Sequence, residues 1–175
     1  MREIVVSVFG SGRVREDAPG CVLAEQVGRA LAQAGFTIAN GGYGGTMRAA
    51  ARGAAQVGGK VIGVTCSAFK SSANEYVTEE VTTASLEERL AKLVQTGQAY
   101  VVLPGGTGTL LELASVWELK NKGFLDAGKP IVLVGGFWQP VVELMESEDP
   151  KCTKSIETAD DPEHAVEIIR KVLDA

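Results

Sequence analysis

Residues 99–112 read AYVVLPGGTGTLLE. The first five form a continuous apolar run rich in β-branched residues, which is typical of a strand buried on both faces. A proline, glycines and threonines follow, and apolar residues then recur at helical spacing. A buried strand that passes through a tight turn into a helix is the unit from which parallel α/β sheets are built.

The same alternation of short strands and longer helices continues along the chain. We expect strands at residues 4–9, 36–39, 60–64, 99–103 and 131–134, with weaker strands at 76–81 and near 155–157. We expect helices at about residues 20–34, 45–57, 86–96, 109–122, 139–146 and 162–173. Ser85 and Glu88 predict a capping box, and Asp161 predicts an N-cap. No linker or repeat interrupts the pattern, so the sequence predicts one domain, residues 1–175, with a Rossmann-like, doubly wound parallel sheet and helices on both faces.

Composition and charge narrow the class of protein. The chain has 175 residues, of which 45% are hydrophobic, and a formal net charge of -5. A mildly acidic chain without a basic patch is not attracted to nucleic acid or to anionic membranes, so we expect neither partner. Three scattered cysteines and one histidine fit neither a disulfide framework nor a zinc site. We therefore expect a cytoplasmic protein without a metal site.

Three glycine-rich turns follow strands of the predicted sheet. The carboxyl ends of parallel strands share one edge, where helix N-termini present free N–H groups to anions. Glycine lets the backbone approach a ligand, and serine and threonine hydroxyls can donate to phosphate oxygens. The candidate phosphate-binding residues are Gly10, Ser11 and Gly12, then Gly41, Gly42, Gly44, Gly45 and Thr46, and finally Gly105, Gly106, Thr107, Gly108 and Thr109. The alternative for each turn is a tight connection without a ligand. None contains a Walker sequence or GxGxxG, so we expect neither ATP hydrolysis nor a bound nicotinamide or other cofactor.

The third turn carries a resemblance to a known family. Residues 104–112, PGGTGTLLE, match the PGGxGTxxE motif of the LONELY GUY family, whose members were formerly called lysine decarboxylase-like. Residues 41–47, GGYGGTM, resemble the GGxxGLM turn of the family, and residues 58–64, GGKVIGV, resemble its GGxVIGV strand. The weaker segments are shared with DNA-processing proteins and with a group of molybdenum cofactor carriers.

Members of this family are cytokinin riboside 5′-monophosphate phosphoribohydrolases, which cleave a nucleoside 5′-monophosphate to a free base and ribose 5-phosphate. The resemblance implies an AMP-like ligand and a catalytic pair formed by Arg89 and Glu112. A carboxylate can stabilise an oxocarbenium-like transition state or orient water, and an arginine can bind phosphate or stabilise the leaving base. Pyridoxal phosphate chemistry is not expected, because no Schiff-base lysine can be picked out.

Two substitutions favour a second candidate function. The family typically has Arg-Lys where this chain has Arg89-Leu90, and often Glu-Glu where it has Leu111-Glu112. The loss of a cation and an anion from the motif leaves open a non-catalytic carrier of a nucleotide-like ligand, such as molybdenum cofactor.

Local patterns offer simpler interpretations of the same residues. Thr109 and Glu112 fit a capping box at a helix start, and Arg89 fits an exposed arginine on a solvated helix face. Arg13 and Arg48 lie beside glycine turns, but exposed arginines are common, so we leave both outside the core of the site.

The helix predicted at residues 109–122 is apolar on nearly every side. Its apolar residues are Leu110, Leu111, Leu113, Ala114, Val116, Trp117 and Leu119, and its narrow polar stripe is Glu112, Ser115 and Lys122. One face of a sheet cannot bury all of that surface, so we expect this helix to contact a second copy of the chain in a homodimer. A neighbouring helix of the same chain is the alternative cover.

Overall fold

The computed structural model describes residues 3–173. Within that range the elements in chain order are β1 (Val5–Phe9), α1 (Pro19–Gln33), β2 (Thr37–Asn40), α2 (Thr46–Ala55), β3 (Val61–Cys66), β4 (Glu79–Thr83), α3 (Leu86–Thr96), β5 (Ala99–Val102), α4 (Thr107–Asn121), β6 (Ile131–Val134), α5 (Gln139–Glu148), the short 3-10 helix η1 (Cys152–Ser155), β7 (Ile156–Ala159) and α6 (Pro162–Leu173).

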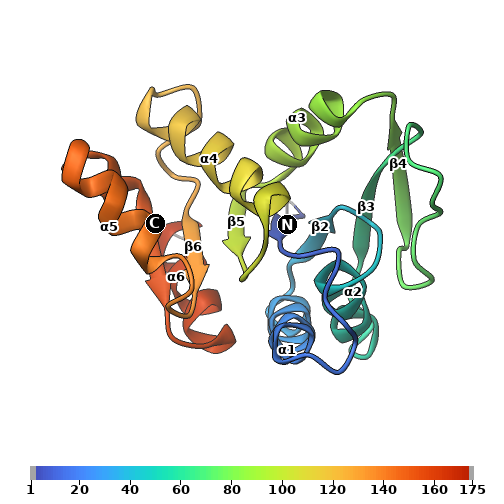
Figure 1. Cartoon of the computed structure of the whole chain (residues 1–175). Coiled ribbons are helices and arrows are strands. Elements are labelled where there is room, and N and C mark those ends of the chain that lie inside the picture. The colour runs from blue at the N-terminus through green and yellow to red at the C-terminus, as the bar shows by residue number, and fades with distance from the viewer. Residues whose placement is uncertain (1–2, 174–175) are drawn as a thin grey trace.

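The strands join in one parallel sheet, in the order β4-β3-β2-β1-β5-β6-β7 (Figure 1). The chain winds outward from β1 to β4, returns to pair β5 against β1, and then winds outward in the other direction through β6 and β7. The topological switch point therefore lies between β1 and β5, where the connections leave in opposite directions and open a crevice. The prediction of a Rossmann-like, doubly wound parallel sheet is confirmed.

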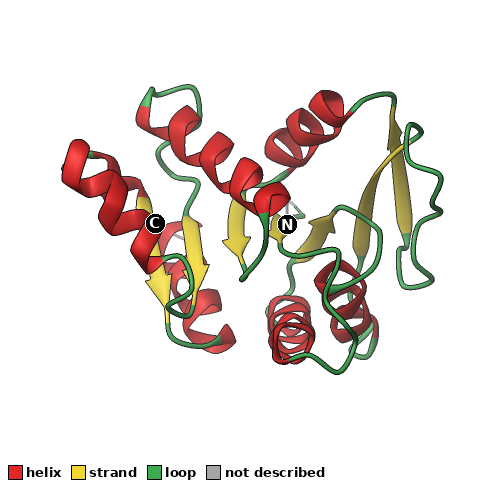
Figure 2. Cartoon of the chain, in the orientation of Figure 1, coloured by secondary structure: helices red, strands yellow, loops and turns green. Residues whose placement is uncertain are grey.

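Helices cover both faces of this sheet (Figure 2). α1, α2 and α6 pack over a core rich in alanine and valine. α3, α4 and α5 pack over the opposite core, which contains the larger side chains of Phe9, Tyr100 and Trp117. Along β1, Val6 and Val8 belong to the first core and Phe9 to the second. Because both faces are buried, the central strands consist of continuous apolar runs.

Two helix starts follow the predicted local signals. The Ser85 hydroxyl accepts a hydrogen bond from the Glu88 backbone N–H at 3.2 Å, and the Glu88 carboxylate accepts one from the Ala84 N–H at 2.9 Å. Asp161 accepts a hydrogen bond from the His164 N–H at 2.8 Å, as an N-cap residue does. Ser85 is therefore the N-cap of α3, as predicted, although Glu88 accepts from the Ala84 N–H rather than from the Ser85 N–H of a complete capping box. This cap fixes the start of the helix that carries Arg89.

Several boundaries differ from prediction, and the starts of α4 and β4 have a clear local cause. α4 begins at Thr107 rather than at residue 109, because Gly106 takes the extended conformation of an N-cap. β4 begins at Glu79 rather than at residue 76, because the Asn74 side chain accepts a hydrogen bond from the Tyr76 N–H at 3.1 Å and turns the chain before the strand. No helix within residues 3–173 has both the length and the apolar character needed to cross a membrane.

Candidate active site

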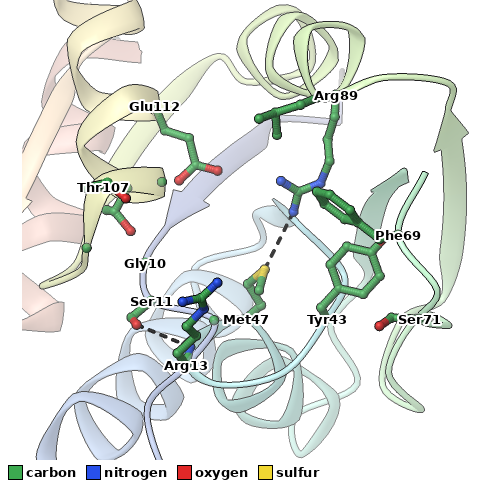
Figure 3. A pocket seen from close by; sticks show the side chains of 15 residues that line it. Gly10, Ser11, Arg13, Tyr43, Met47, Phe69, Ser71, Arg89, Thr107 and Glu112 are labelled. Atoms are coloured by element: carbon green, nitrogen blue, oxygen red, sulfur yellow. Dashed lines mark hydrogen bonds between the residues drawn. The ribbon is translucent and has the colours of Figure 1, made fainter. Parts of the chain in front are cut away.

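A cleft of about 660 Å³ opens at the switch point, beyond the carboxyl ends of β1 and β5 (Figure 3). It brings together these residues of the predicted site: Gly10, Ser11, Gly12, Arg89, Gly106, Thr107, Gly108, Thr109 and Glu112. The other candidates, Gly41, Gly42, Gly44, Gly45, Thr46 and Gly105, do not line it. The first and third turns thus face the cleft, whereas the backbone of the second turn lies behind it.

Arg89 is held rigidly in the wall of the cleft. Its side chain is buried, Nε donates a hydrogen bond to the Val64 carbonyl at 2.7 Å, and Nη2 donates to the Gly41 carbonyl at 3.0 Å. Its guanidinium carbon also lies 5.5 Å from the centre of the Tyr43 ring. These contacts leave Nη1 free of hydrogen bonds within the described residues. The interpretation of Arg89 as an exposed arginine is therefore wrong.

Glycine at position 41 is explained by this arginine. A Cβ there would come within 1.7 Å of Arg89 Nη2 and 2.5 Å of the Met47 sulfur. The second turn was expected to hold phosphate, but this glycine makes room for a side chain of the protein itself.

A second glycine of this turn, Gly45, supports the first turn, whereas Gly42 packs against Gly63 of β3. Gly45 has a φ of 60°, and a Cβ there would lie 2.3 Å from the Ser11 carbonyl oxygen. That oxygen also accepts hydrogen bonds from the Thr46 backbone N–H at 2.9 Å and hydroxyl at 3.1 Å. Gly42 also has a positive φ, of 75°. The second turn thereby fixes the position of Ser11 at the cleft.

Glu112 projects from α4 into the cleft toward Arg89 (Figure 3). Among residues 3–173 its carboxylate has neither a hydrogen bond nor an ion pair, although the positive charge of Arg89 faces it across the cleft. Burial raises the pKa of Glu112 to about 7, and Arg89 opposes part of that rise. A carboxyl group that is unpaired, partly desolvated and half ionised near neutral pH is suited to proton transfer or to stabilising positive charge.

The N-terminus of α4 forms the opposite wall. Gly106 is the N-cap and provides no side-chain acceptor, so the capping box expected from Thr109 and Glu112 is wrong. The first backbone hydrogen bond of the helix runs from the Leu110 N–H to the Gly106 carbonyl at 2.9 Å. Within the described residues, the N–H groups of Thr107, Gly108 and Thr109 have no acceptor. Free N–H groups at the positive end of a helix dipole form an anion site.

Gly105 shapes this turn from behind. A Cβ at position 105 would lie 2.1 Å from the Thr109 hydroxyl, so only glycine lets the turn close on that buried side chain. A Cβ on Gly106 or Gly108 would meet no atom within 4 Å. Those two glycines therefore face open space in the cleft.

Several lining residues were not placed in the site by sequence reasoning. They are Arg13, Tyr43, Met47, Phe69, Ser71 and Leu86. The rings of Tyr43 and Phe69 lie 5.8 Å apart and tilted by 59°, which gives the cleft an aromatic side. Arg13 has no carboxylate partner among residues 3–173, whereas Arg48 lies outside the cleft and pairs with Glu16 and Glu75. No periodic pattern marks the loop that carries Phe69 and Ser71, but Tyr43 lies within a glycine-rich turn and could have been chosen for that reason.

The structure also places the residues that could have offered other chemistry. Cys21, Cys66 and Cys152 are buried free thiols. His164 lies at the exposed start of α6 and not in the cleft. Within residues 3–173 no group of three histidine, cysteine, aspartate or glutamate side chains could hold a metal ion.

Comparisons with known proteins show the family of the chain. Residues 47–169 match the model of a family described as "possible lysine decarboxylase". An uncharacterised protein of Archaeoglobus fulgidus is 30% identical over 78% of this chain and 87% of its own length. Proteins named cytokinin riboside 5′-monophosphate phosphoribohydrolase from Mycobacterium tuberculosis and Rhodococcoides fascians are 36% and 32% identical over 64% and 71% of this chain. The chain spans only 60% and 65% of the length of those two relatives.

Solved structures share the whole fold. A molybdenum cofactor binding protein from Rippkaea orientalis superposes with a TM-score of 0.82, at 25% identity over 99% of both chains. The molybdenum cofactor carrier protein of Chlamydomonas reinhardtii gives a TM-score of 0.80, at 26% identity over 99% of this chain and 100% of its own. Because the family model matches well over half of the residues, the chain belongs to the possible lysine decarboxylase family, also called the LONELY GUY family.

Proposed function

We propose that the protein is a phosphoribohydrolase that cleaves the N-glycosidic bond of nucleoside 5′-monophosphates. The observation that carries the proposal is the position of the unpaired Glu112 carboxylate, which faces the fixed Arg89 guanidinium across one cleft beside the free N–H groups of α4. Relatives that carry the name of such an enzyme support it.

In this proposal the phosphate, the base and the ribose of the nucleotide each contact a different set of cleft residues. We place the phosphate at the start of α4, against the N–H groups of Thr107 and Gly108, because helix N-termini bind anions. We place the planar base against Tyr43 and Phe69, since aromatic rings stack on aromatic bases. The ribose then lies between these walls, within reach of Glu112.

The reaction breaks the bond between ribose C1′ and the base nitrogen, and the electron pair leaves with the base. The ionised form of Glu112 stabilises the positive charge that develops on the ribose and orients the attacking water. The hydroxyl of that water joins C1′, and its proton goes to the base. Arg89 stabilises negative charge on the phosphate or on the departing base, because its guanidinium keeps its charge and has a free Nη1.

The description "possible lysine decarboxylase" does not fit the chemistry of the cleft. Among the described residues that line it, none is a lysine, so there is no amine that could form a Schiff base with pyridoxal phosphate. The cations of the cleft are the arginines Arg13 and Arg89.

A carrier of a nucleotide-like ligand is the second candidate function. It is favoured by the similarity, over almost the whole chain, to molybdenum cofactor binding and carrier proteins. The substitutions at Leu90 and Leu111 give it less support than the sequence suggested, because neither residue lines the cleft. Leu90 packs against the core beneath α3, and the Leu111 side chain is exposed.

We further propose that the protein forms a homodimer through α4. This helix buries Leu113, Val116 and Trp117 against the sheet but leaves Leu110 and Leu111 39% and 44% exposed. These two adjacent leucines offer an apolar surface through which two copies of the chain can pack.

The deciding experiment incubates the protein with AMP and, separately, with isopentenyladenosine monophosphate. Chromatography for the free base measures hydrolysis, and calorimetry with AMP on the Glu112→Gln variant measures binding without turnover. Free base from the native chain, together with a loss of at least about a hundredfold in the variant, supports the phosphoribohydrolase. AMP binding without cleavage by the native chain supports the carrier, and the absence of both rejects the phosphoribohydrolase and a carrier of AMP.

A further inference from the structure

Two loops form much of the rim of the cleft. The loop between β1 and α1 carries Ser11 and Arg13, and the loop between β3 and β4 carries Phe69 and Ser71. Neither loop has the hydrogen bonds of a strand in the sheet, so contacts with other elements must hold the loops in place. In Figure 1 the first loop runs alongside α2 before it reaches α1.

One arginine on α2 contacts both loops. Arg48 Nη1 donates to Glu16 in the first loop at 2.5 Å. Its Nε donates to Glu75 Oε2 in the second loop at 3.1 Å, and its Nη2 donates to Glu75 Oε1. The guanidinium also lies 5.4 Å from the centre of the Tyr76 ring. The pairing with Glu75 is the two-pronged geometry that makes arginine–carboxylate contacts strong.

The start of the first loop is held by the hydrogen bonds from Thr46 to the Ser11 carbonyl, and Val14 packs against the core. Beyond Ser11, the side-chain anchor of this loop is Arg48. Within residues 3–173, the hydrogen bond from Arg48 to Glu16 is the only hydrogen bond between residues 12–17 and a distant part of the chain. The other hydrogen bonds of that stretch are local, such as those between Arg15 and Asp17. The second loop has a further anchor in Asn74, whose side chain donates to the Gly42 carbonyl at 3.0 Å. Arg48 is therefore the link that ties the two rim loops to each other.

We propose that Arg48 is a positioning residue that holds both rim loops in place and thereby sets the affinity of the cleft for its ligand. The part of the proposal that concerns affinity rests on the proposed function, whereas the part that concerns the loops does not. Glu16 and Glu75 are 70% and 56% exposed, so each ion pair alone is weak. Loss of the shared cation breaks both pairs at once and leaves two carboxylates near the rim.

Trypsin tests the loops without any ligand. Arg13 and Arg15 are cleavage sites in the first loop, and Lys70 is one in the second. We expect trypsin to cleave these sites roughly three- to tenfold faster in Arg48→Gln, because the loss of two exposed ion pairs lets the loops open more often. The control is Arg52→Gln, on the same helix, because Arg52 pairs with Glu25 of α1 and not with either loop. Unchanged cleavage in Arg48→Gln, or equal acceleration in Arg52→Gln, would overturn the proposal.

Calorimetry with AMP separates positioning from simple charge. Arg48→Gln removes a positive charge, whereas the double variant Glu16→Gln/Glu75→Gln removes negative charge, and both break the same contacts. Positioning predicts that AMP binds roughly three- to tenfold more weakly to both variants. If charge alone acted, the double variant would bind AMP more tightly, and that result would overturn the role in affinity. If the native chain bound no AMP, the proposed function would fail while the trypsin comparison still decided the role of Arg48 in the loops.

Discussion

The substitution Glu112→Gln should stabilise the protein at alkaline pH. Burial raises the pKa of Glu112 from 4.5 to about 7 in the folded chain, because the cleft disfavours its charged form. Glutamine has nearly the same shape as the protonated acid but never carries the charge. The variant therefore avoids the loss of stability that results from keeping an unpaired carboxylate in the cleft.

The sign and size of the effect follow from proton linkage. Between pH 4.5 and about 7 the folded chain holds the Glu112 proton more tightly than the unfolded chain does, so native stability falls as the pH rises through that window. One pKa unit corresponds to about 1.4 kcal/mol, so the destabilisation reaches roughly 3 kcal/mol at pH 8 but at most about 1 kcal/mol at pH 5. Glu112→Gln should raise the free energy of unfolding by those amounts.

Urea unfolding of the native chain and the variant at pH 5 and pH 8 measures the difference. Glu118→Gln is the matched control, because Glu118 lies on the same helix with its side chain 64% exposed and an ion pair to Lys122. The control should change the unfolding free energy by no more than about 0.5 kcal/mol at either pH. An equal effect of Glu112→Gln at both pH values would refute a raised pKa at this position.

Three further outcomes are expected. Arg89→Ala should lower nucleotide hydrolysis by at least about a hundredfold, because it removes the fixed guanidinium from the cleft; a steady-state assay with AMP would show turnover near native if this reasoning is wrong. Gly106→Val should abolish AMP binding in calorimetry, because the added side chain projects toward the proposed anion site. Thermal unfolding should stay cooperative, since a Cβ at this position meets no atom within 4 Å. If the variant bound AMP as tightly as the native chain does, the phosphate would not bind at this turn. Leu111→Asp should shift the mass measured by light scattering from dimer to monomer, because this leucine is 44% exposed on α4; a monomeric native chain would reject the dimer.

The dimer test uses Leu111 because the structure separates the two apolar sides of α4. Sequence periodicity marked the helix as apolar all round but could not show which leucines face the sheet. Trp117 lies in the core of its own chain, and its indole N–H donates to the Cys152 carbonyl at 2.8 Å. A charge at Trp117 would damage the fold itself, whereas one at Leu111 would not.

The sheet could be predicted because its signals are local. β5 and β6 are continuous buried runs, and the capping residue Ser85 acts within three residues of itself. The ends of β4 and α4 depend instead on the conformations of Asn74 and Gly106, which no spacing reveals. The βα pattern predicted a doubly wound parallel sheet, because parallel crossovers have few topologies. The order of the strands came only from the structure.

The site could be predicted only in part. A glycine in a turn indicates that another group comes close to the backbone, but the sequence does not show whether that group is a ligand or a part of the protein. Gly106 faces the cleft, whereas Gly41 makes room for Arg89 and Gly45 for the Ser11 carbonyl, although all three occur in similar turns. Arg13 lies beside the first glycine turn and lines the cleft, but it was left outside the core of the predicted site because exposed arginines are common. Contacts between segments 35 to 48 residues apart decide these roles.

The separation of Arg89 from Glu112 is itself a requirement of the proposed chemistry. A direct ion pair between them would lower the pKa of the carboxyl group and close the cleft. The carbonyls of Val64 and Gly41 prevent it, because they hold the guanidinium against the sheet edge. Glu112 therefore stays without a partner, and its pKa stays near 7. A positive charge that develops on a bound ribose would supply the missing partner, so the interaction with Glu112 becomes stronger in the transition state than in the ground state, which is the condition for catalysis.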